Sequence, residues 1–356
     1  MQINELLIEA KEKEASDLHL NVGIPPVLRI NGKLTRLHLP ELTPEITHEM
    51  IYSILSEKQK SDFEKYGELD LSYELINISR FRVNVFKHRR GEGAAFRLIP
   101  EKIKTLSELG LPSILSDFTE KDRGLVLVTG PTGSGKSTTL AALIDIINNN
   151  RYDNIITIED PIEFIHSHKN CLVSQREIGS HTPSFASALR NALREDPDVI
   201  LVGEMRDLET ISMALTAAET GHLVFSTLHT ISASETIERI IDVFPPHQQN
   251  QIRMQIAGSL LGVVAQTLLP DLEGKSRVPA LEIMVANPAI RNLIREGKAY
   301  QISSTIQISK KDGMQSLDQS LKDLLMEGKI SQEDALKKAV DKKSFMEHSM
   351  EHSYKH

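Results

Sequence analysis

The segment from Gly130 to Ser137 constrains the fold of this chain more than any other part of its sequence. It fits the pattern G-x-x-x-x-G-K-[ST], and it lies between the apolar run Leu125–Val128 and a stretch with helical periodicity. In such a strand–loop–helix unit, backbone N–H groups surround phosphate oxygens, and the helix N-terminus favours their negative charge. We therefore expect Lys136 to reach the β- and γ-phosphates of ATP and Ser137 to bind Mg²⁺. The residues expected to bind the nucleotide are Thr132, Gly133, Ser134, Gly135, Lys136, Ser137 and Thr138.

Downstream of this loop, short apolar runs alternate with segments of helical periodicity. The runs Ile155–Ile158, Val199–Val202 and Leu223–Phe225 read as strands, and helices are expected near Phe185–Leu193 and Thr210–Ala218. Apolar strands separated by helices indicate a parallel sheet that is covered on both faces. The predicted fold class is therefore α/β.

The length of 356 residues suits two domains of ordinary size. Residues 1–115 predict a smaller α+β domain, with strands at Val27–Ile30, Arg80–Phe86 and Ala94–Ile99. The polar residues 116–122 predict a linker, and residues 123–356 predict the ATPase domain with a helical C-terminal region. At its end the tail carries three histidines four apart, for which a frayed, solvated segment is expected rather than a metal site. These are His348, His352 and His356.

Composition excludes several other classes of protein. Cys171 is the only cysteine, so an intrachain disulfide and a four-cysteine zinc site are excluded, and a reducing, cytoplasmic location is expected. The net charge of -8 argues against a protein that coats nucleic acid, and no nucleic-acid partner is expected. The longest uncharged stretch, Met254–Pro270, contains polar residues and is too short for a transmembrane segment.

Acidic residues follow two of the predicted strands. Glu204 comes directly after the run that ends at Gly203, where an acidic group beside a phosphate-binding loop holds Mg²⁺ and its water shell. Because Gly203 occupies the usual position of the aspartate, Glu204 is expected to act through water. Glu163 closes the acidic segment Ile158–Glu163 and is expected to orient the attacking water. The alternatives are a helix cap for Glu204 and a solvated loop acid for Glu163.

Histidine and arginine residues complete the candidate site. His229 lies in the polar segment Ser226–Thr230, which can sense the γ-phosphate, and His222 precedes the same strand; a structural role is the alternative for both. Six basic residues occur within positions 80–97, and the interpretations are nucleic-acid contact, a solvated strand face, or arginines delivered to ATP phosphates across an interface. The six are Arg80, Arg82, Lys87, Arg89, Arg90 and Arg97.

Taken together and in this order, the motifs resemble those of the secretion ATPase superfamily, the hexameric motors of type II and type IV secretion and of type IV pili. The motifs are the loop 130–137, the acidic segment 158–163, the strand 199–204 and the segment 226–230. The segments Ala15–His19 and Gly23–Pro26 are similar to the start of the type IV pilus retraction ATPases, and Ala289–Glu296 is similar to their distinguishing signature. The resemblance covers roughly residues 1 to 345.

This resemblance implies a PAS-like N-terminal domain on a RecA-like P-loop ATPase domain, with six subunits in a ring. It implies that Glu163 is the catalytic glutamate and Glu204 the Walker B acid. His222 and His229 match the histidine box, and Arg82 and Arg97 match the N-domain arginines that reach the γ-phosphate.

The implied activity is ATP hydrolysis that drives pilus retraction, and with it twitching motility. The implied partners are the pilus machinery and its inner-membrane platform protein, with the ring peripheral at the cytoplasmic side of that membrane. The alternative is a pilus-extension or type II secretion ATPase that lacks the zinc module. The lone cysteine favours retraction.

The signature segment itself predicts a short helix between Asn287, an N-cap, and Gly297. Its apolar residues are expected on one face, and Arg291 and Arg295 lie one turn apart on another. The resemblance implies that this helix passes motion or contact to the pilus machinery, whereas the pattern alone also fits a structural surface helix. The apolar residues are Ala289, Ile290, Leu293 and Ile294.

Overall fold

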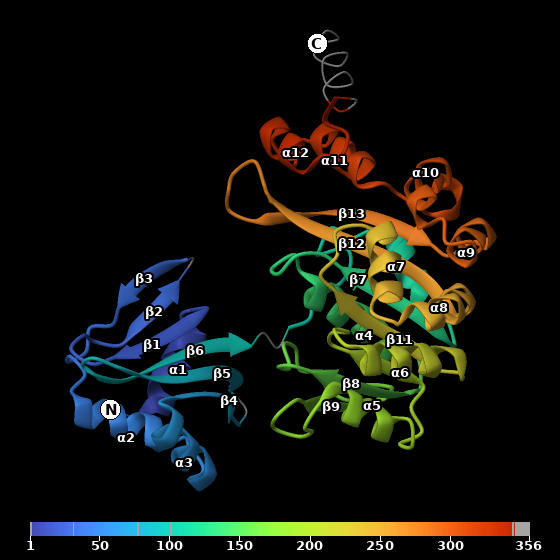
Figure 1. Cartoon of the computed structure of the whole chain (residues 1–356). Coiled ribbons are helices and arrows are strands. Elements are labelled where there is room, and N and C mark those ends of the chain that lie inside the picture. The colour runs from blue at the N-terminus through green and yellow to red at the C-terminus, as the bar shows by residue number, and fades with distance from the viewer. Residues whose placement is uncertain (1, 31, 77, 100–101, 344, 346–356) are drawn as a thin grey trace. The chain divides into compact units, whose positions relative to one another are not determined.

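The chain forms two compact units, Met1–Lys102 and Ile103–His356, in a computed structural model (Figure 1). The structure describes residues 2–30, 32–76, 78–99, 102–343 and 345. The predicted histidine tail with His348, His352 and His356 lies outside the described residues.

The first unit contains a six-stranded antiparallel sheet in the order β3-β2-β1-β6-β5-β4. The strands are β1 (Asp17–Asn21), β2 (Val27–Ile30), β3 (Lys33–Arg36), β4 (Glu68–Leu75), β5 (Ser79–His88) and β6 (Gly91–Ile99), and the helices are α1 (Ile3–Glu12), α2 (Pro44–Tyr52) and α3 (Glu57–Tyr66). The three strands predicted in this region are confirmed. The positions of strands β1, β3 and β4 and of the three helices were not predicted.

Side chains alternate between the two faces of this sheet, as they do in any strand. Phe81, Val83 and Phe96 are buried and share one hydrophobic core with residues of α1, α2 and α3. The intervening residues of the same strands, among them Arg82 and Arg97, lie on the opposite face. The helices therefore cover one face of the sheet, and the charged side chains lie on the other.

The second unit contains a seven-stranded sheet in the order β13-β12-β7-β11-β10-β8-β9. Its neighbouring strands are parallel except for the antiparallel pair β12 and β13, which confirms the predicted α/β class. The strands are β7 (Gly124–Thr129), β8 (Asn154–Glu159), β9 (Leu172–Glu177), β10 (Val199–Val202), β11 (Leu223–Leu228), β12 (Leu260–Pro270) and β13 (Arg277–Val285).

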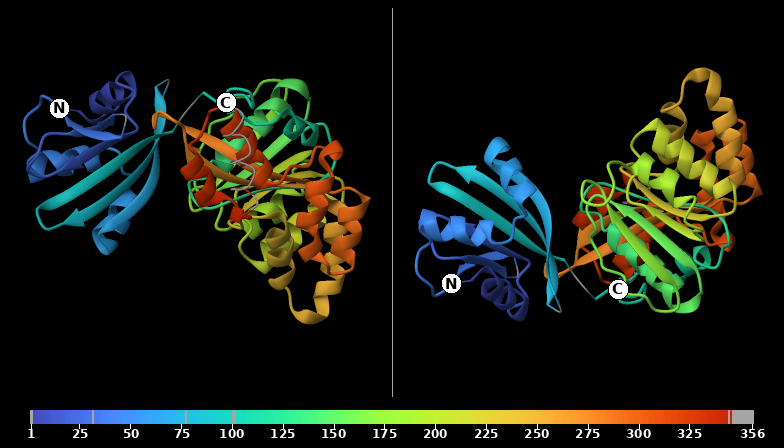
Figure 2. Two further views of the ribbon diagram at one scale, coloured as in Figure 1. Left: turned by 90° about the horizontal axis from the view of Figure 1, so that it is seen from above. Right: turned by 90° about the horizontal axis from the view of Figure 1, so that it is seen from below.

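Helices cover both faces of this second sheet (Figure 2). Leu125 and Leu127 of β7 join a core with the helices of one face, whereas Val126 and Val128 join a core with α4 and η1 on the other. On the second face lie α4 (Lys136–Asn150) and the 3₁₀ helix η1 (Ser113–Phe118). The other helices are α5 (Phe185–Ala192), α6 (Leu208–Glu219), α7 (Ala233–Asp242), α8 (Pro246–Ser259), α9 (Pro288–Arg295), α10 (Ile302–Ile308), α11 (Leu317–Met326) and α12 (Gln332–Lys338).

The predicted boundary between the two domains is wrong by about a dozen residues. The segment expected to end the first domain and form the linker instead packs into the core of the second unit, where Leu106, Leu115 and Phe118 are buried. Phe118 lies so close to β12 that a Cβ at Gly262 would overlap its ring. A linker was predicted here because most residues of 116–122 are polar, although Phe118 within this segment is buried.

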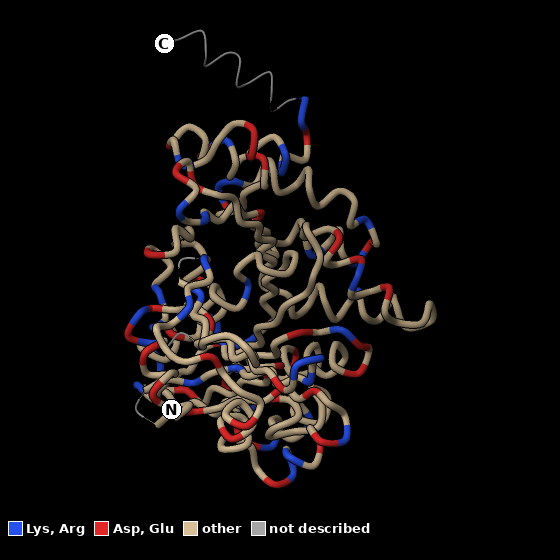
Figure 3. The backbone as a smooth tube through the Cα atoms, turned by 90° about the vertical axis from the view of Figure 1, so that its left-hand side faces the viewer, with Lys and Arg blue, Asp and Glu red and all other residues tan. Residues whose placement is uncertain are grey.

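The uncharged stretch Met254–Pro270 forms the end of α8 and the largely buried strand β12. Within the described part of the chain, no helix has the length and apolar character that crossing a membrane requires. Acidic and basic positions are interspersed along the chain in both units (Figure 3).

Candidate active site

The phosphate-binding loop connects the end of β7 at Thr129 to the start of α4 at Lys136. Gly130 has a φ of 140° and Gly135 a φ of 88°, a region that side-chain-bearing residues rarely adopt. A Cβ at Gly130 would overlap the carbonyl oxygen of Gln266, and one at Gly135 would lie 2.7 Å from its side-chain nitrogen. Both glycines are therefore required by backbone conformation and by the close approach of β12.

Gln266 of β12 holds the loop through its side chain. Its Nε2 donates a hydrogen bond to the Ser134 carbonyl (2.7 Å), and its Oε1 accepts one from the Thr139 hydroxyl (2.7 Å). On the neighbouring strand, Arg277 donates to the carbonyl of Gly133 at 3.3 Å. The sequence reasoning missed both residues, although a buried amide inside an apolar strand is a signal for such a role.

The side chain of Lys136 folds back over its own loop. Its ammonium group donates to the carbonyls of Gly130 (2.8 Å) and Pro131 (3.2 Å). Burial lowers the pKa of Lys136, and the charges of Glu204 and Glu163 act in the opposite direction. The Lys136 ammonium and the carboxylates of Glu204 and Glu163 are therefore close enough to interact electrostatically.

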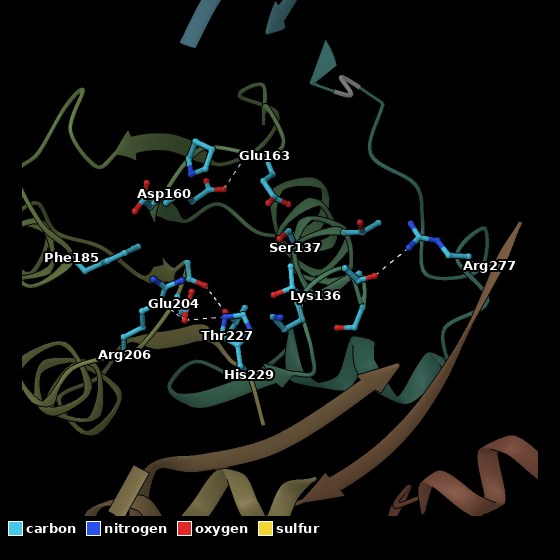
Figure 4. A pocket seen from close by; sticks show the side chains of 18 residues that line it. Lys136, Ser137, Asp160, Glu163, Phe185, Glu204, Arg206, Thr227, His229 and Arg277 are labelled. Atoms are coloured by element: carbon cyan, nitrogen blue, oxygen red, sulfur yellow. Dashed lines mark hydrogen bonds and ion pairs between the residues drawn. The ribbon is translucent and has the colours of Figure 1, made fainter. Parts of the chain in front are cut away.

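A cavity of about 350 Å³ lies over the loop, and the predicted residues Glu163, Glu204 and His229 line it together with Lys136 and Ser137 (Figure 4). They follow the carboxyl ends of adjacent parallel strands, where open α/β sheets bind their ligands. Further lining residues are Thr132, Gly133, Ser134, Gly135, Thr138, Glu159, Asp160, Pro161, Phe185, Gly203, Arg206, Thr227 and Arg277.

Glu204 is paired with two basic side chains. Its carboxylate lies 3.0 Å from Nε2 of His229 and accepts a hydrogen bond from Nε of Arg206. Burial would raise the pKa of Glu204, but the hydrogen bond from Arg206 and the charges of both partners outweigh it and hold the pKa below its ordinary value. Glu204 is thus a carboxylate at neutral pH. Arg206 is a further residue that the sequence reasoning missed.

Glu163 is exposed at the cavity, and the partly buried acid Glu159 contacts its backbone. Glu159 accepts hydrogen bonds from the Thr157 hydroxyl (2.7 Å), the Gln175 amide (3.2 Å) and the backbone N–H of Glu163 (3.5 Å). Burial raises the pKa of Glu159, against the effect of these hydrogen bonds. The two acids therefore differ in environment: Glu159 anchors the loop, and Glu163 is open to the cavity.

The remaining predicted residues do not lie in this cavity. His222 precedes β11, at the end opposite His229, and its Nδ1 lies 2.9 Å from the carbonyl of Ala217. The two histidines therefore lie at opposite ends of β11, a strand of six residues, and His229 but not His222 lines the cavity of this chain. Arg82 and Arg97 belong to the first unit, where they are cross-strand neighbours on β5 and β6.

The residues around the cavity suit Mg²⁺ together with a nucleotide. Ser137 offers a hydroxyl oxygen, and Glu204 offers a carboxylate, which are the oxygen ligands that Mg²⁺ prefers. Among residues that the structure describes, no group of three or more His, Cys, Asp or Glu could hold a metal by itself. An ion bound through one or two side chains and substrate phosphates fits this arrangement.

The loop after the acidic segment is pinned by Gln175, whose side chain accepts from the backbone N–H of His166 (2.8 Å) and donates to the Phe164 carbonyl (2.9 Å). Burial lowers the pKa of His166 to about 4. Because the unfolded chain binds this proton with a pKa near 6.5, stability falls as the pH drops below that value.

We expect acid to destabilise the wild-type chain more than a His166→Leu variant. Between about pH 7.5 and about pH 5, the wild type should lose about 2 kcal/mol of unfolding free energy that the variant keeps. Urea titrations of both proteins at the two pH values measure this difference. Equal losses in the two proteins would show that His166 does not stay neutral in the folded chain.

Helix α9 contains the signature segment, and the roles of its two arginines differ. Arg291 donates hydrogen bonds to the carbonyls of Ala286 (2.8 Å), Gly258 (3.0 Å) and Leu260 (2.8 Å), and also to that of Ala257. It thereby caps the C-terminus of α8, whose last carbonyls have no helical partner. These contacts give Arg291 a structural role, which is the alternative that the pattern of this helix also fits.

The rest of α9 follows the predicted pattern in part. Asn287 is the N-cap, Ile290 and Ile294 are buried, and Leu293 packs against the same core. Ala289 is exposed and does not belong to the apolar face. The side chain of Arg295 is exposed, and it forms no hydrogen bond or ion pair with any residue that the structure describes.

Comparison with known proteins gives consistent matches over nearly the whole chain. The sequence profile of a family described as "Type II/IV secretion system protein" matches residues 1–320. The type IV pilus retraction ATPase PilT of Pseudomonas aeruginosa is 54% identical over 345 residues, which covers 97% of this chain and 100% of that protein. A twitching motility protein of Neisseria gonorrhoeae is 52% identical, covering 90% of this chain and 85% of its own length.

Solved structures agree with these sequence relatives. The crystal structure of the pilus retraction motor PilT with bound ADP has a TM-score of 0.91 to this chain at 50% identity, covering 97% of this chain and 98% of the other.

Proposed function

This chain belongs to the type II/IV secretion system protein family, and from that premise we propose that it is the ATP-hydrolysing motor of type IV pilus retraction. It is an ATPase of the kind that drives twitching motility. The observation that carries this function is the convergence of Lys136, Glu163, Glu204 and His229 on one cavity over the phosphate-binding loop. The near-full-length identity to retraction ATPases supports retraction as the output.

Each residue of the cavity has a distinct task in the proposed reaction. On ATP binding, Lys136 exchanges the carbonyls of Gly130 and Pro131 for β- and γ-phosphate oxygens, and the N–H groups at the start of α4 bind the same phosphates. Ser137 and Glu204 would hold Mg²⁺, the latter through water, and the ion would supply positive charge beside the phosphates. Glu163 orients the attacking water, and His229 reports the γ-phosphate to Glu204.

We further infer a RecA-like fold for the second unit and a PAS-like fold for the first. The parallel sheet with its phosphate-binding loop supports the former, and the antiparallel sheet with helices on one face supports the latter. The working form is proposed to be a homohexamer, in which Arg82 and Arg97 reach the γ-phosphate across a subunit interface. We propose that His222 acts at such an interface and not in the cavity of its own chain.

The ring is proposed to lie in the cytoplasm, peripheral at the inner membrane, where it contacts the platform protein of the pilus machinery. No nucleic-acid partner is proposed. A pilus-extension or type II secretion ATPase without a zinc module is the alternative function. Cys171 is the only cysteine in the sequence, so a four-cysteine metal site is excluded, and this favours retraction.

The exposed Arg295 allows the output of the motor to be tested apart from its chemistry. We expect Arg295→Ala to have the native mass of a six-subunit ring in the presence of ATP and to keep ATP turnover within about twofold of wild type. In cells, the same variant should lose pilus retraction. Arg291→Ala should instead lower the melting temperature and ATP turnover, because it leaves several carbonyls at the end of α8 without a donor. Normal retraction by Arg295→Ala would remove this residue from the output surface, and a stable monomer with ATP would contradict the ring.

A further inference from the structure

Charged residues form a row across the open face of the first unit's sheet. In the register of the strands, Arg29 of β2 lies beside Asp17 of β1, and Asp17 lies beside Arg97 of β6. Arg97 in turn lies beside Arg82 of β5. We call these four residues the arginine row. Because the cores of α1, α2 and α3 pack against the other face, the helices do not cover it.

Asp17 is the only acid of the row, and its side chain is 8% exposed. One carboxylate oxygen accepts a hydrogen bond from Nε of Arg97 at 2.9 Å. The other accepts from the Ser16 hydroxyl at 2.8 Å and lies 3.7 Å from Nε of Arg29. Burial would raise the pKa of Asp17, but Ser16 and Arg97 outweigh it and keep the pKa below its ordinary value. The group is thus a fixed negative charge.

The contact through Nε leaves the two terminal nitrogens of Arg97 available. Its side chain is 71% exposed, and within the described ranges Asp17 is the only residue with which it forms a hydrogen bond or ion pair. Arg29 differs, because one of its terminal nitrogens already donates to the Gly32 carbonyl at 2.9 Å. Asp17 therefore holds Arg97 through Nε, and the two terminal nitrogens of Arg97 remain able to donate to a ligand.

The row also carries more positive charge than its own acid neutralises. Like charges directly opposite on neighbouring strands are destabilising, and Arg82 lies directly opposite Arg97. The side chain of Arg82 is exposed and forms no hydrogen bond or ion pair with any residue that the structure describes, so the two guanidinium groups can bind an anion from outside the sheet. Paired guanidinium groups with free donors match the oxygens of a phosphate group.

We propose that Asp17 is a positioning residue, which holds the Arg97 guanidinium by its Nε so that the terminal nitrogens meet the γ-phosphate of ATP. This inference rests on the proposed role of Arg97 at that phosphate. A free arginine side chain must lose its rotamer freedom when it binds, and a guanidinium already held by a carboxylate loses less. Asp17 thereby assists a contact that matters most as charge develops in the transition state.

The test is a double-mutant cycle on ATP turnover of the full-length chain. Arg97→Ala should lower kcat by more than about 10-fold. Asp17→Asn, which keeps the shape of the side chain but removes its charge, should lower kcat by about 3- to 10-fold with KM for ATP near the wild-type value. In the Arg97→Ala background the Asp17→Asn change should have no further effect, because there is no guanidinium left to position.

Asp70→Asn is the matched control. Asp70 of β4 lies on the same face, and its contact is with the Asn84 amide at 3.3 Å rather than with an arginine. Its kcat should equal that of the wild type. Ser16→Ala removes only one restraint on Asp17 from an exposed position, so it tests the same idea with little risk to folding. It should lower kcat by about twofold, again only when Arg97 is present.

Each outcome of the cycle has one meaning. Normal turnover by Arg97→Ala would overturn the proposed role of Arg97, and with it this inference. A loss with Arg97→Ala but none with Asp17→Asn would overturn the positioning role alone. Multiplicative losses in the double variant would assign Asp17 to folding, as would a fall in kcat that tracks a fall in melting temperature. If Asp17→Asn does not fold, Ser16→Ala is measured instead, in the wild-type and in the Arg97→Ala background. An equal fold-loss of kcat in both backgrounds would overturn the proposal.

Discussion

Lys136→Ala is expected to reduce ATP turnover by about a hundredfold or more. The ammonium group lies within the loop itself, where burial lowers the pKa of Lys136 and the charges of Glu204 and Glu163 oppose that shift. Without it, charge on the transferred phosphoryl group loses a stabilising partner. Steady-state phosphate release at saturating ATP measures the loss.

Lys169→Ala is the control for this substitution. Lys169 also belongs to the second unit and forms an ion pair with Asp145 of α4 at 2.6 Å, but it does not line the cavity. Removing it should leave turnover within about twofold of wild type, since exposed ion pairs contribute little. Turnover by Lys136→Ala close to that of the control would show that the loop does not bind the reacting phosphates.

Glu163→Gln and Glu204→Gln should separate nucleotide binding from chemistry. Both variants are expected to bind ATP with affinity within a few-fold of wild type and to lose turnover by about a hundredfold or more, because the carboxylates act in the catalytic step. Glu204→Gln also removes the negative partner of Arg206 and His229. Nucleotide titration and single-turnover hydrolysis of the same preparations measure the two quantities.

Glu209→Gln provides the matched control, because Glu209 is exposed on α6, where it pairs with Arg190 outside the cavity. It should bind and hydrolyse ATP as the wild type does. A weaker affinity with unchanged turnover in the Glu163 or Glu204 variant would assign that residue to nucleotide binding rather than to catalysis.

The second unit could be predicted from sequence because its strands are buried on both faces. Runs such as Val199–Val202 are continuous and apolar, and the glycine pattern of the loop has one structural context. The helical periodicity of α4 follows directly from Leu140, Leu143 and Ile147, which are all buried. The acids that follow these strands, Glu163 and Glu204, line one cavity.

Residues whose roles depend on contacts distant in sequence could not be predicted. Gln266 and Arg277 reach the loop from β12 and β13, more than a hundred residues after it. Arg291 and Arg295 lie one turn apart in the same helix and look equivalent in the sequence. Only Arg291 donates to carbonyls of α8 and β12, and this difference becomes visible only in the folded chain. The domain boundary was misplaced for the same reason, because the burial of Phe118 depends on Gly262.

We propose that ATP hydrolysis by this chain powers pilus retraction. The most direct measurement is pilus retraction in living cells of the source bacterium, observed with labelled pili after the chromosomal gene is replaced by Glu163→Gln or Glu209→Gln. With equal protein levels, we predict that Glu209→Gln cells extend and retract pili at the wild-type frequency, whereas Glu163→Gln cells extend pili and fail to retract them. Retraction at the wild-type frequency by Glu163→Gln cells, together with a confirmed loss of ATP turnover in the purified variant, would contradict the account.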